Sequence, residues 1–323
     1  MFYSLPIEVQ LDVLKCLNFN QLFSFKQTNF YSLNLINKYE NGLARMKFDE
    51  LKIDTYDLFD SYDYTIIVPE SAVSEFILND QLKAKWNAAI AKPIPLYLYS
   101  IRYSEGAEFS IYLNPTYLLK LPNIPKNIEE MFIIRSGLKQ LFNCVVRDAS
   151  FTEVLFNPEM INLLFDNDKT ISPQFNIQEP YLVFRNNTFN NFLEFTLNHL
   201  VNSTYLTLNI FNITNFEEYT DILFNILTNE GNKFPKIVLQ SPKFQRLYDL
   251  IVEYIITSKD CSKMVSKIGL NIPYQNLKLN KRAENVSVRF DTIIRYEIAN
   301  IYNPKVRFSF DNWRGGSTLI ERM

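Results

Sequence analysis

The chain has 323 residues, and its 33 Lys and Arg nearly balance its 35 Asp and Glu, so the formal net charge is −2. Hydrophobic residues make up 47% of the chain, a proportion that excludes disorder over most of its length. The near-zero charge argues against nucleic-acid binding through whole-protein electrostatics. With only 7 glycines, Gly-rich phosphate loops are not expected, and the length predicts about two domains.

Residues 1–48 are expected to form three short helices. Pro6 suits the first turn of the first helix. Two apolar series follow at helical spacing: Val9, Val13 and Leu17, and Ile7, Leu11 and Leu14. One apolar face can pack into an internal core, whereas a second needs another surface to cover it. Two further helices are predicted over residues 21–27 and 29–47.

Residues 49–63 contain a cluster of carboxylates. Its members are Asp49, Glu50, Asp54, Asp57, Asp60 and Asp63. The segment lacks the glycine and the terminal glutamate of an EF-hand calcium loop at the required intervals. We therefore interpret residues 49–63 as a solvated acidic linker.

From residue 64 to residue 323, short strand-like runs alternate with amphipathic helical runs. The strand cores share an apolar-x-apolar format and fall at residues 66–68, 96–98, 111–113, 154–156, 182–184, 206–208, 237–239, 268–270 and 306–308. Alternation of this kind predicts β-α units and a parallel sheet. We expect an α/β fold, an open solenoid with a curved parallel sheet, similar to leucine-rich-repeat (LRR) proteins. A closed barrel or a doubly wound sheet is the alternative.

The sequence offers no recognisable catalytic or metal-binding constellation. His199 is the only histidine, and it ends a predicted helix, where a histidine is ordinary. A Ser-His-Asp triad would need it, and the chain has no Gly-x-Ser-x-Gly elbow. No Cys/His pair has zinc-ligand spacing. We expect no catalytic residue, no metal and no cofactor, and keep an enzyme of unrecognised type as a minor alternative.

The cysteines and the apolar pattern bear on the compartment. Cys16, Cys144 and Cys261 are odd in number and far apart, which favours free thiols in a reducing compartment. The N-terminus has no signal-peptide pattern, and no stretch approaches the roughly 18 apolar residues of a membrane span. We expect no membrane contact and an intracellular location, in the cytoplasm or the nucleus.

The opening segment carries a family resemblance. It reads Leu5-Pro6-Ile7-Glu8-Val9-x-Leu11-x-Val13-Leu14-x-Cys16-Leu17, followed by Leu22-x-x-Phe25. This pattern, over about residues 2–48, resembles an F-box, and the whole layout is similar to nematode-type F-box proteins, in which an α/β region follows the box. The sequence departs from the family pattern at three places: Gln10, where an apolar residue is common, Thr28-Asn29, and Tyr31, near the usual Trp.

The resemblance implies a three-helix F-box over residues 1–48 and a substrate-recognition domain over residues 64–323. It implies the substrate-recognition subunit of an SCF-type cullin ubiquitin ligase, bound to a Skp-family adaptor and through it to a cullin scaffold. By carry-over, the adaptor-binding residues are Leu5, Pro6, Val9, Val13, Leu17 and Leu22. Leu14, Phe25 and Leu33 are expected in the core of the bundle. The alternative is an LRR-like protein-interaction module without a ligase role.

A target protein would bind the strand-lined face of the predicted solenoid. Side chains alternate along a strand, so if Leu206, Leu208 and Ile210 point inward, their neighbours point outward. The same register predicts a target-binding surface of Tyr181, Arg185, Tyr205, Thr207, Asn209, Lys236, Gln240, Lys267 and Asn271. Its mixture of aromatic, amide and cationic groups suits protein recognition.

Residues 243–323 hold an excess of basic side chains. They include Lys278, Lys281, Arg282, Arg289, Arg295, Lys305 and Arg307. Such an excess can steer an acidic target toward the protein, and an ordinary solvated face would look the same.

Overall fold

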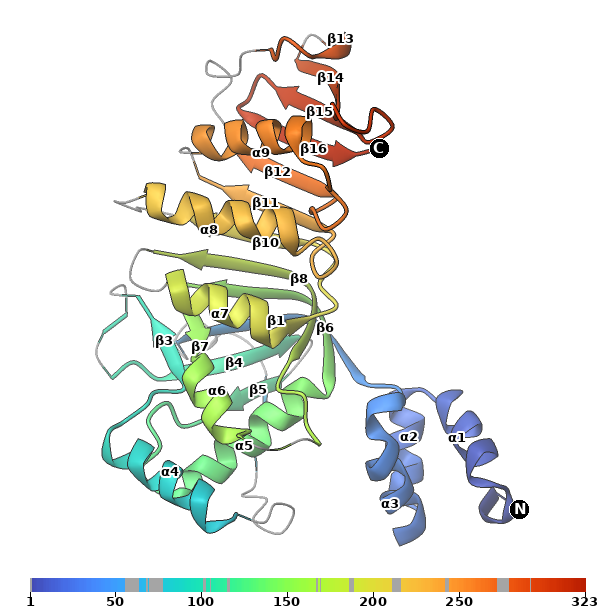
Figure 1. The fold of residues 1–323 in the computed structure, drawn as a ribbon. Coiled ribbons are helices and arrows are strands. Elements are labelled where there is room, and N and C mark those ends of the chain that lie inside the picture. Colours follow the sequence, from blue (N-terminus) through green and yellow to red (C-terminus); the bar gives the residue numbers. More distant parts are fainter. Residues whose placement is uncertain are drawn as a thin grey trace.

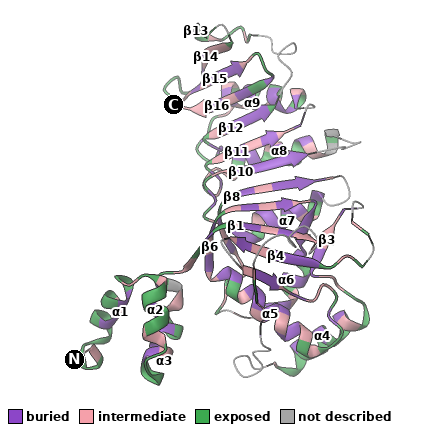
Figure 2. Ribbon diagram, turned by 180° about the vertical axis from the view of Figure 1, so that it is seen from behind, coloured by how far each residue is buried: buried purple, intermediate pink, exposed green. Residues whose placement is uncertain are grey.

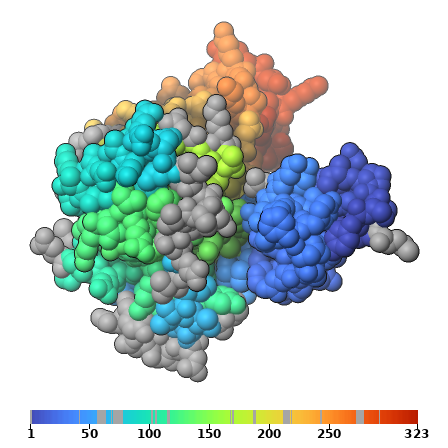
Figure 3. Space-filling view, turned by 90° about the horizontal axis from the view of Figure 1, so that it is seen from below, coloured from blue at the N-terminus to red at the C-terminus, as the bar shows by residue number. Residues whose placement is uncertain are grey.

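The computed structural model is a mixed α/β fold with a large open sheet. It describes residues 2–55, 64–67, 69, 78–100, 103–104, 106–114, 117–166, 168, 170–185, 189–210, 216–241, 244–271, 279–290 and 292–323. Asp57, Asp60, Asp63 and Lys278 of the sequence analysis lie outside these residues. The helical N-terminal segment and the α/β region have separate hydrophobic cores, and Figure 3 shows the former as a lobe beside the latter.

The N-terminal bundle contains α1 (Ile7–Lys15), α2 (Phe19–Lys26) and α3 (Phe30–Tyr39), with 3-10 turns at Phe2–Ser4 and Glu40–Gly42. Asn18 begins α2 with a capping box, and Asn29 caps α3. The core consists of Leu14, Leu22, Leu35, Ile36 and Leu43. The third helix ends earlier than predicted, because the chain turns at Glu40–Gly42 and then enters a strand.

The main sheet has strand order β13-β14-β15-β16-β12-β11-β10-β8-β6-β1-β4-β5-β2. Its strands are β1 (Met46–Thr55), β2 (Thr65–Ile67), β4 (Phe109–Asn114), β5 (Tyr117–Lys120), β6 (Cys144–Thr152), β8 (Phe175–Phe184), β10 (Leu206–Ile210), β11 (Lys236–Gln240), β12 (Lys267–Asn271), β13 (Glu284–Arg289), β14 (Ile293–Ala299), β15 (Arg307–Trp313) and β16 (Ser317–Arg322). The short β9 (Leu200–Val201) pairs with β8. The sheet is not closed into a barrel.

The expectation of a parallel sheet holds for its centre and for the pair of β5 and β2 at one end. Strands β1, β6, β8, β10, β11 and β12 run parallel to one another. On one side of this centre, β4 pairs antiparallel with β1. On the other side, β16 pairs antiparallel with β12, and β15, β14 and β13 follow in turn, each antiparallel to its neighbour. Among the described residues no helix separates β13 to β16, so hairpin connections replace the crossovers that parallel pairing needs.

The interpretation of residues 49–63 as an acidic linker is wrong for residues 49–55, the part that the structure describes. Residues 49–55 belong to β1, a central strand paired with β4 and β6. Leu51 and Ile53 are buried, whereas the carboxylates of Asp49 and Glu50 form ion pairs. Asp49 contacts Arg147 at 3.1 Å, and Glu50 contacts Lys52 at 2.8 Å.

Two predicted strands form a separate small sheet. Residues 96–98 and 154–156 correspond to β3 (Tyr97–Tyr99) and β7 (Val154–Phe156), which pair antiparallel with each other. The strand that lies between β8 and β1 in the main sheet is β6, which was not predicted from the sequence. Its run Cys144–Thr152 carries Arg147 and Asp148 in the middle, which breaks the apolar alternation.

Helices cover one side of the sheet, as Figures 1 and 2 show for α7 (Phe189–His199), α8 (Phe216–Asn229) and α9 (Gln245–Thr257). α4 (Asp80–Ala91), α5 (Ile128–Phe142) and α6 (Pro158–Leu164) pack around the N-terminal half of the domain. Leu206, Leu208 and Ile210 of β10 belong to the hydrophobic core, as the predicted register expects, although Thr207 and Asn209 between them are buried as well. The opposite side of the central strands therefore carries the candidate target surface.

Candidate functional site

An apolar stripe runs along the outer side of α1. Leu5, Val9 and Val13 are 37%, 43% and 41% exposed, and Pro6 beside them is also exposed. Val9 and Val13 stand at i and i+4 in α1 and so share one side of the helix, and Leu5 lies just before its first residue. Leu14 faces the other way and is fully buried in the bundle core. The bundle thus stabilises itself with one face of α1 and leaves the second face uncovered (Figure 2).

Two of the predicted adaptor-binding residues differ from this stripe. Leu22 is only 3% exposed and belongs to the bundle core, so its assignment as a docking residue is wrong. Leu17 is half-buried and packs against the same core. Among the residues expected in the core, Leu14 is buried, Phe25 packs against it and Leu33 is half-buried.

Exposed aromatic side chains were missed by the sequence analysis. Tyr3, Phe23, Phe30 and Tyr31 are all exposed in the bundle. Their helical spacing matches that of buried neighbours, so no signal in the sequence distinguishes them. Tyr3 and Tyr31 pack against each other edge to face, with ring centroids 5.4 Å apart.

The positions that depart from the F-box pattern are linked by hydrogen bonds. Gln10 is buried, donates from Nε2 to the Leu5 carbonyl at 2.8 Å and accepts from the Tyr31 hydroxyl at 2.7 Å. Asn29 donates to the Tyr3 hydroxyl at 2.6 Å. Hydrogen bonds with Ser32 and Asn29 lower the pKa of Tyr3. The network joins α1 and the residues before it to α3, and so fixes the orientation of the apolar stripe.

The predicted target residues form adjacent rows on the helix-free side of the sheet. Tyr181 pairs with Thr207, and Asn209 pairs with Gln240. Lys236 pairs with Lys267 on the next strand. The strand register therefore brings these side chains together over β8, β10, β11 and β12, and Asn271 continues the surface as an exposed residue at the end of β12.

Several of these side chains are already engaged with each other. Asn209 donates to the Tyr181 hydroxyl at 2.8 Å, and the Lys236 ammonium lies 3.8 Å from the centroid of the Tyr205 ring. Thr207 and Asn209 are each only 7% exposed. The prediction that Thr207 and Asn209 contact a target is therefore corrected. Both lie beneath larger neighbouring side chains and support the surface from below.

The cations at both ends of this surface are paired with carboxylates. Arg185 contacts Glu153 at 2.9 Å, and Glu153 is buried and also accepts from the Ser100 hydroxyl. Lys267 contacts Glu321 at 2.9 Å. Pairing holds both cations in place and reduces the charge that they present to solvent.

An acidic depression that the sequence analysis did not find adjoins the target surface. Glu50, Asp148 and Glu179 are paired across β1, β6 and β8. They line a depression of about 270 Å³ together with Tyr181, Tyr205 and Thr207. The three strands lie side by side only through the parallel pairing, so sequence distance hides the cluster.

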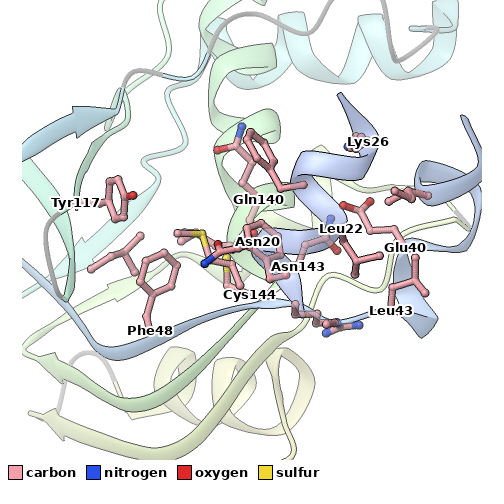
Figure 4. A pocket seen from close by; sticks show the side chains of 18 of the residues that line it. Asn20, Leu22, Lys26, Glu40, Leu43, Phe48, Tyr117, Gln140, Asn143 and Cys144 are labelled. Atoms are coloured by element: carbon pink, nitrogen blue, oxygen red, sulfur yellow. Dashed lines mark hydrogen bonds between the residues drawn. The ribbon is translucent and has the colours of Figure 1, made fainter. Parts of the chain in front are cut away.

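A larger cavity of about 570 Å³ lies between the bundle and the sheet (Figure 4). Leu22 and Leu43 line it from the bundle, and Phe48, Tyr117 and Cys144 line it from the α/β domain. Burial raises the pKa of the Cys144 thiol to about 12, and the thiol donates to the Gln140 carbonyl at 3.1 Å. The Cys144 thiol is therefore protonated at neutral pH.

The structure gives His199 a structural environment. The side chain is buried, and its Nδ1 lies 2.9 Å from the Pro173 carbonyl. Burial lowers its pKa, so the ring is neutral and donates that hydrogen bond. Among the described residues, no group of three or more His, Cys, Asp or Glu is arranged to hold a metal ion. None of the helices in the described part of the chain combines the length and apolar character needed to cross a membrane.

Comparison with known families gives one match. The model of a family described as a domain of unknown function, DUF8381, matches residues 67–211. This range runs from the end of β2 past β10 and includes neither the N-terminal bundle nor β11 to β16. No curated protein and no solved structure matches the chain.

Proposed function

We propose that this chain is the substrate-recognition subunit of an SCF-type cullin ubiquitin ligase. The observation that carries the proposal is the apolar stripe of Leu5, Val9 and Val13, which stays partly exposed to solvent in the described chain. A contiguous exposed apolar surface on a small bundle is typical of a protein-docking site. In the F-box pattern that this segment resembles, the same positions contact the Skp-family adaptor.

The division into two cores supports the proposal. The bundle has its own small core, and β1 follows it directly as a central strand of the sheet. Arg45 between them donates to the Phe142 carbonyl at the end of α5. A docking module joined closely to a larger domain would present a bound target at a defined position relative to the ligase.

The larger domain provides the target surface in this proposal. The units β8-α7-β10-α8-β11-α9-β12 repeat strand and helix, with parallel pairing throughout, as expected for an LRR-like solenoid. Tyr181, Tyr205 and Lys236 stand on its helix-free side. A receptor of this kind acts by raising the effective concentration of the target near the ubiquitin-charged enzyme, so it needs no catalytic residue of its own.

The direct test is binding of the purified full chain to a purified Skp-family adaptor, measured by titration calorimetry. The variant Val9→Asp/Val13→Asp places two carboxylates on the stripe, and we expect it to abolish measurable binding. The control Asn34→Asp/Asn37→Asp adds the same charge at exposed positions of α3 and should bind like the wild type. Circular dichroism should show the same helix content for all three proteins.

Two results would overturn the proposal. The first is a wild-type chain that does not bind the adaptor, and the second is binding that the stripe variant leaves unchanged. Either result would favour the alternative function, a protein-interaction module without a ligase role.

A further inference from the structure

Strand β13 forms one end of the main sheet, and in the described part of the chain no strand pairs with its outer side. Among the described residues it pairs with β14 alone, through Ser287 to Arg295 and the pairs that follow. All six residues of β13 are exposed, and Figure 1 places the strand at the far end of the domain from the bundle. An edge strand presents unpaired backbone N–H and C=O groups that another strand can use.

This edge has a bulge between Glu284 and Ser287, one of the devices that limit edge pairing, but it carries no proline and no charge at its centre. Natural edge strands are commonly blocked by a central charge or a proline, whereas the centre of β13 reads Val286-Ser287-Val288. Val286 and Val288 are 49% and 59% exposed, and Phe290 just beyond the strand is 88% exposed. The edge therefore combines available backbone groups with apolar side chains that water solvates in the free chain.

Charge identifies the kind of strand that fits. Lys281, Arg282 and Arg289 are exposed, and no ion pair links them to another described residue. The carboxylate in this stretch, Glu284, is already paired with Arg307 at 2.6 Å. A strand paired with β13 would thus contact Val286 and Val288 at its centre and positively charged side chains at its two ends.

We infer that β13 binds an extended segment of a partner protein, with alternating acidic and apolar residues, by adding it as a further strand to the sheet. Main-chain hydrogen bonds would supply affinity, and the flanking cations would select for acidic side chains. The inference holds whether or not the bundle binds an adaptor.

A second copy of this chain is a poorer occupant of the same edge. Pairing β13 with β13 of another copy would bring two sets of Lys281, Arg282 and Arg289 together. Both Glu284 carboxylates are already engaged, so the added contacts would be mostly between like charges, which disfavours association.

The experiment uses the full chain and fluorescent peptides in an anisotropy titration at low salt. The probe is an alternating Glu-Val peptide of about eight residues, long enough to span a typical strand. One comparison peptide replaces each Glu with Lys. A second keeps the acidic sequence and carries N-methyl groups on alternate residues, which removes hydrogen-bond donors without changing charge. We expect binding of the first peptide only.

Charge-reversal variants test the location. Lys281→Glu/Arg282→Glu/Arg289→Glu changes exposed side chains and should weaken binding of the acidic peptide roughly tenfold or more. The matched control, Lys83→Glu/Lys92→Glu/Lys126→Glu, alters exposed lysines of the N-terminal half and should bind like the wild type.

Three outcomes would overturn the inference. Equal binding of the N-methylated peptide would show charge attraction without strand addition. Equal loss in the control variant would show a general charge effect. A dimer in sedimentation experiments that the β13 variant abolishes would identify the second copy as the occupant.

Discussion

The buried ion pair between Arg135 of α5 and Asp168, which follows α6, should be the most sensitive electrostatic contact in the α/β domain. Both side chains are largely buried. Arg135 also donates to the Leu164 carbonyl and stacks 4.4 Å from the centre of the Phe165 ring. Asp168 accepts two further hydrogen bonds from Thr170, at 2.9 Å and 2.6 Å. The pair thus joins two helices through charges that water cannot easily reach.

Removing each partner should have a different cost. Asp168→Ala leaves a buried guanidinium without its carboxylate, and breaking a buried pair in this way costs about 3–5 kcal/mol. We expect a value near 3 kcal/mol, because the Leu164 carbonyl remains. Arg135→Met retains much of the packing on Phe165 and leaves Asp168 with its Thr170 hydrogen bonds, so we expect about 1–2 kcal/mol.

Urea unfolding followed by tryptophan fluorescence measures both costs. Trp86 is fully buried, and its ring lies 5.2 Å from that of Phe132 on α5, so it reports on this part of the domain. Equal costs for the two variants, or a loss below about 1 kcal/mol for Asp168→Ala, would refute the reasoning.

The pH dependence provides an independent check of the same pair. Burial alone would raise the pKa of Asp168, but hydrogen bonds from Thr170 and Arg135 outweigh it and lower the pKa. The stabilisation is therefore complete above the unfolded value of about 3.9 and is lost as the pH falls through the lower folded value. The stability difference between wild type and Asp168→Ala should be constant near neutral pH and disappear in acid.

Three further predictions address other parts of the chain. Burial lowers the pKa of His199, so as the pH falls the unfolded chain takes up a proton before the folded chain does. The free energy of unfolding should therefore fall by at most about 1.4 kcal/mol per pH unit below pH 6.5. His199→Leu should remove this dependence in urea titrations between pH 7.5 and 5.5. A Cβ at Gly231 would lie 2.4 Å from a backbone oxygen, whereas one at Gly42 would meet nothing within 4 Å, so thermal unfolding should show a loss of about 1–3 kcal/mol for Gly231→Ala and little change for Gly42→Ala. The variant Val9→Ala/Val13→Ala removes four methyl groups, each worth about 0.8 kcal/mol when fully buried. The two valines are 43% and 41% exposed in the free chain, so adaptor binding would bury only that fraction of them. Adaptor affinity should therefore fall about tenfold in calorimetry.

The sequence predicts the elements whose apolar pattern reflects one buried face. The runs at Leu206, Ile237 and Ile268 were expected as parallel strands, and they pair in that register. Their neighbouring helices have clear periodicity because one stripe of each packs on the sheet.

The elements that the sequence does not reveal carry charges that pair only in the folded protein. Arg147 on β6 and Asp49 on β1 are far apart in the chain and 3.1 Å apart in the structure. Each interrupts an apolar alternation, so β6 was missed and part of β1 was interpreted as a linker. Leu22 illustrates a second limit: the resemblance to an F-box assigned it to the adaptor-binding surface, whereas it packs with Leu14, Leu35 and Ile36 in the bundle core.

The most direct test of the central claim is hydrogen–deuterium exchange of the full chain with and without the Skp-family adaptor. The account predicts slower exchange of the backbone amides of α1 when the adaptor is present, with no change in the strands β8 to β12. It also predicts that the Val9→Asp/Val13→Asp variant loses this protection. Adaptor-dependent protection confined to the sheet, with α1 unchanged, would contradict the claim that the uncovered face of α1 is the docking site.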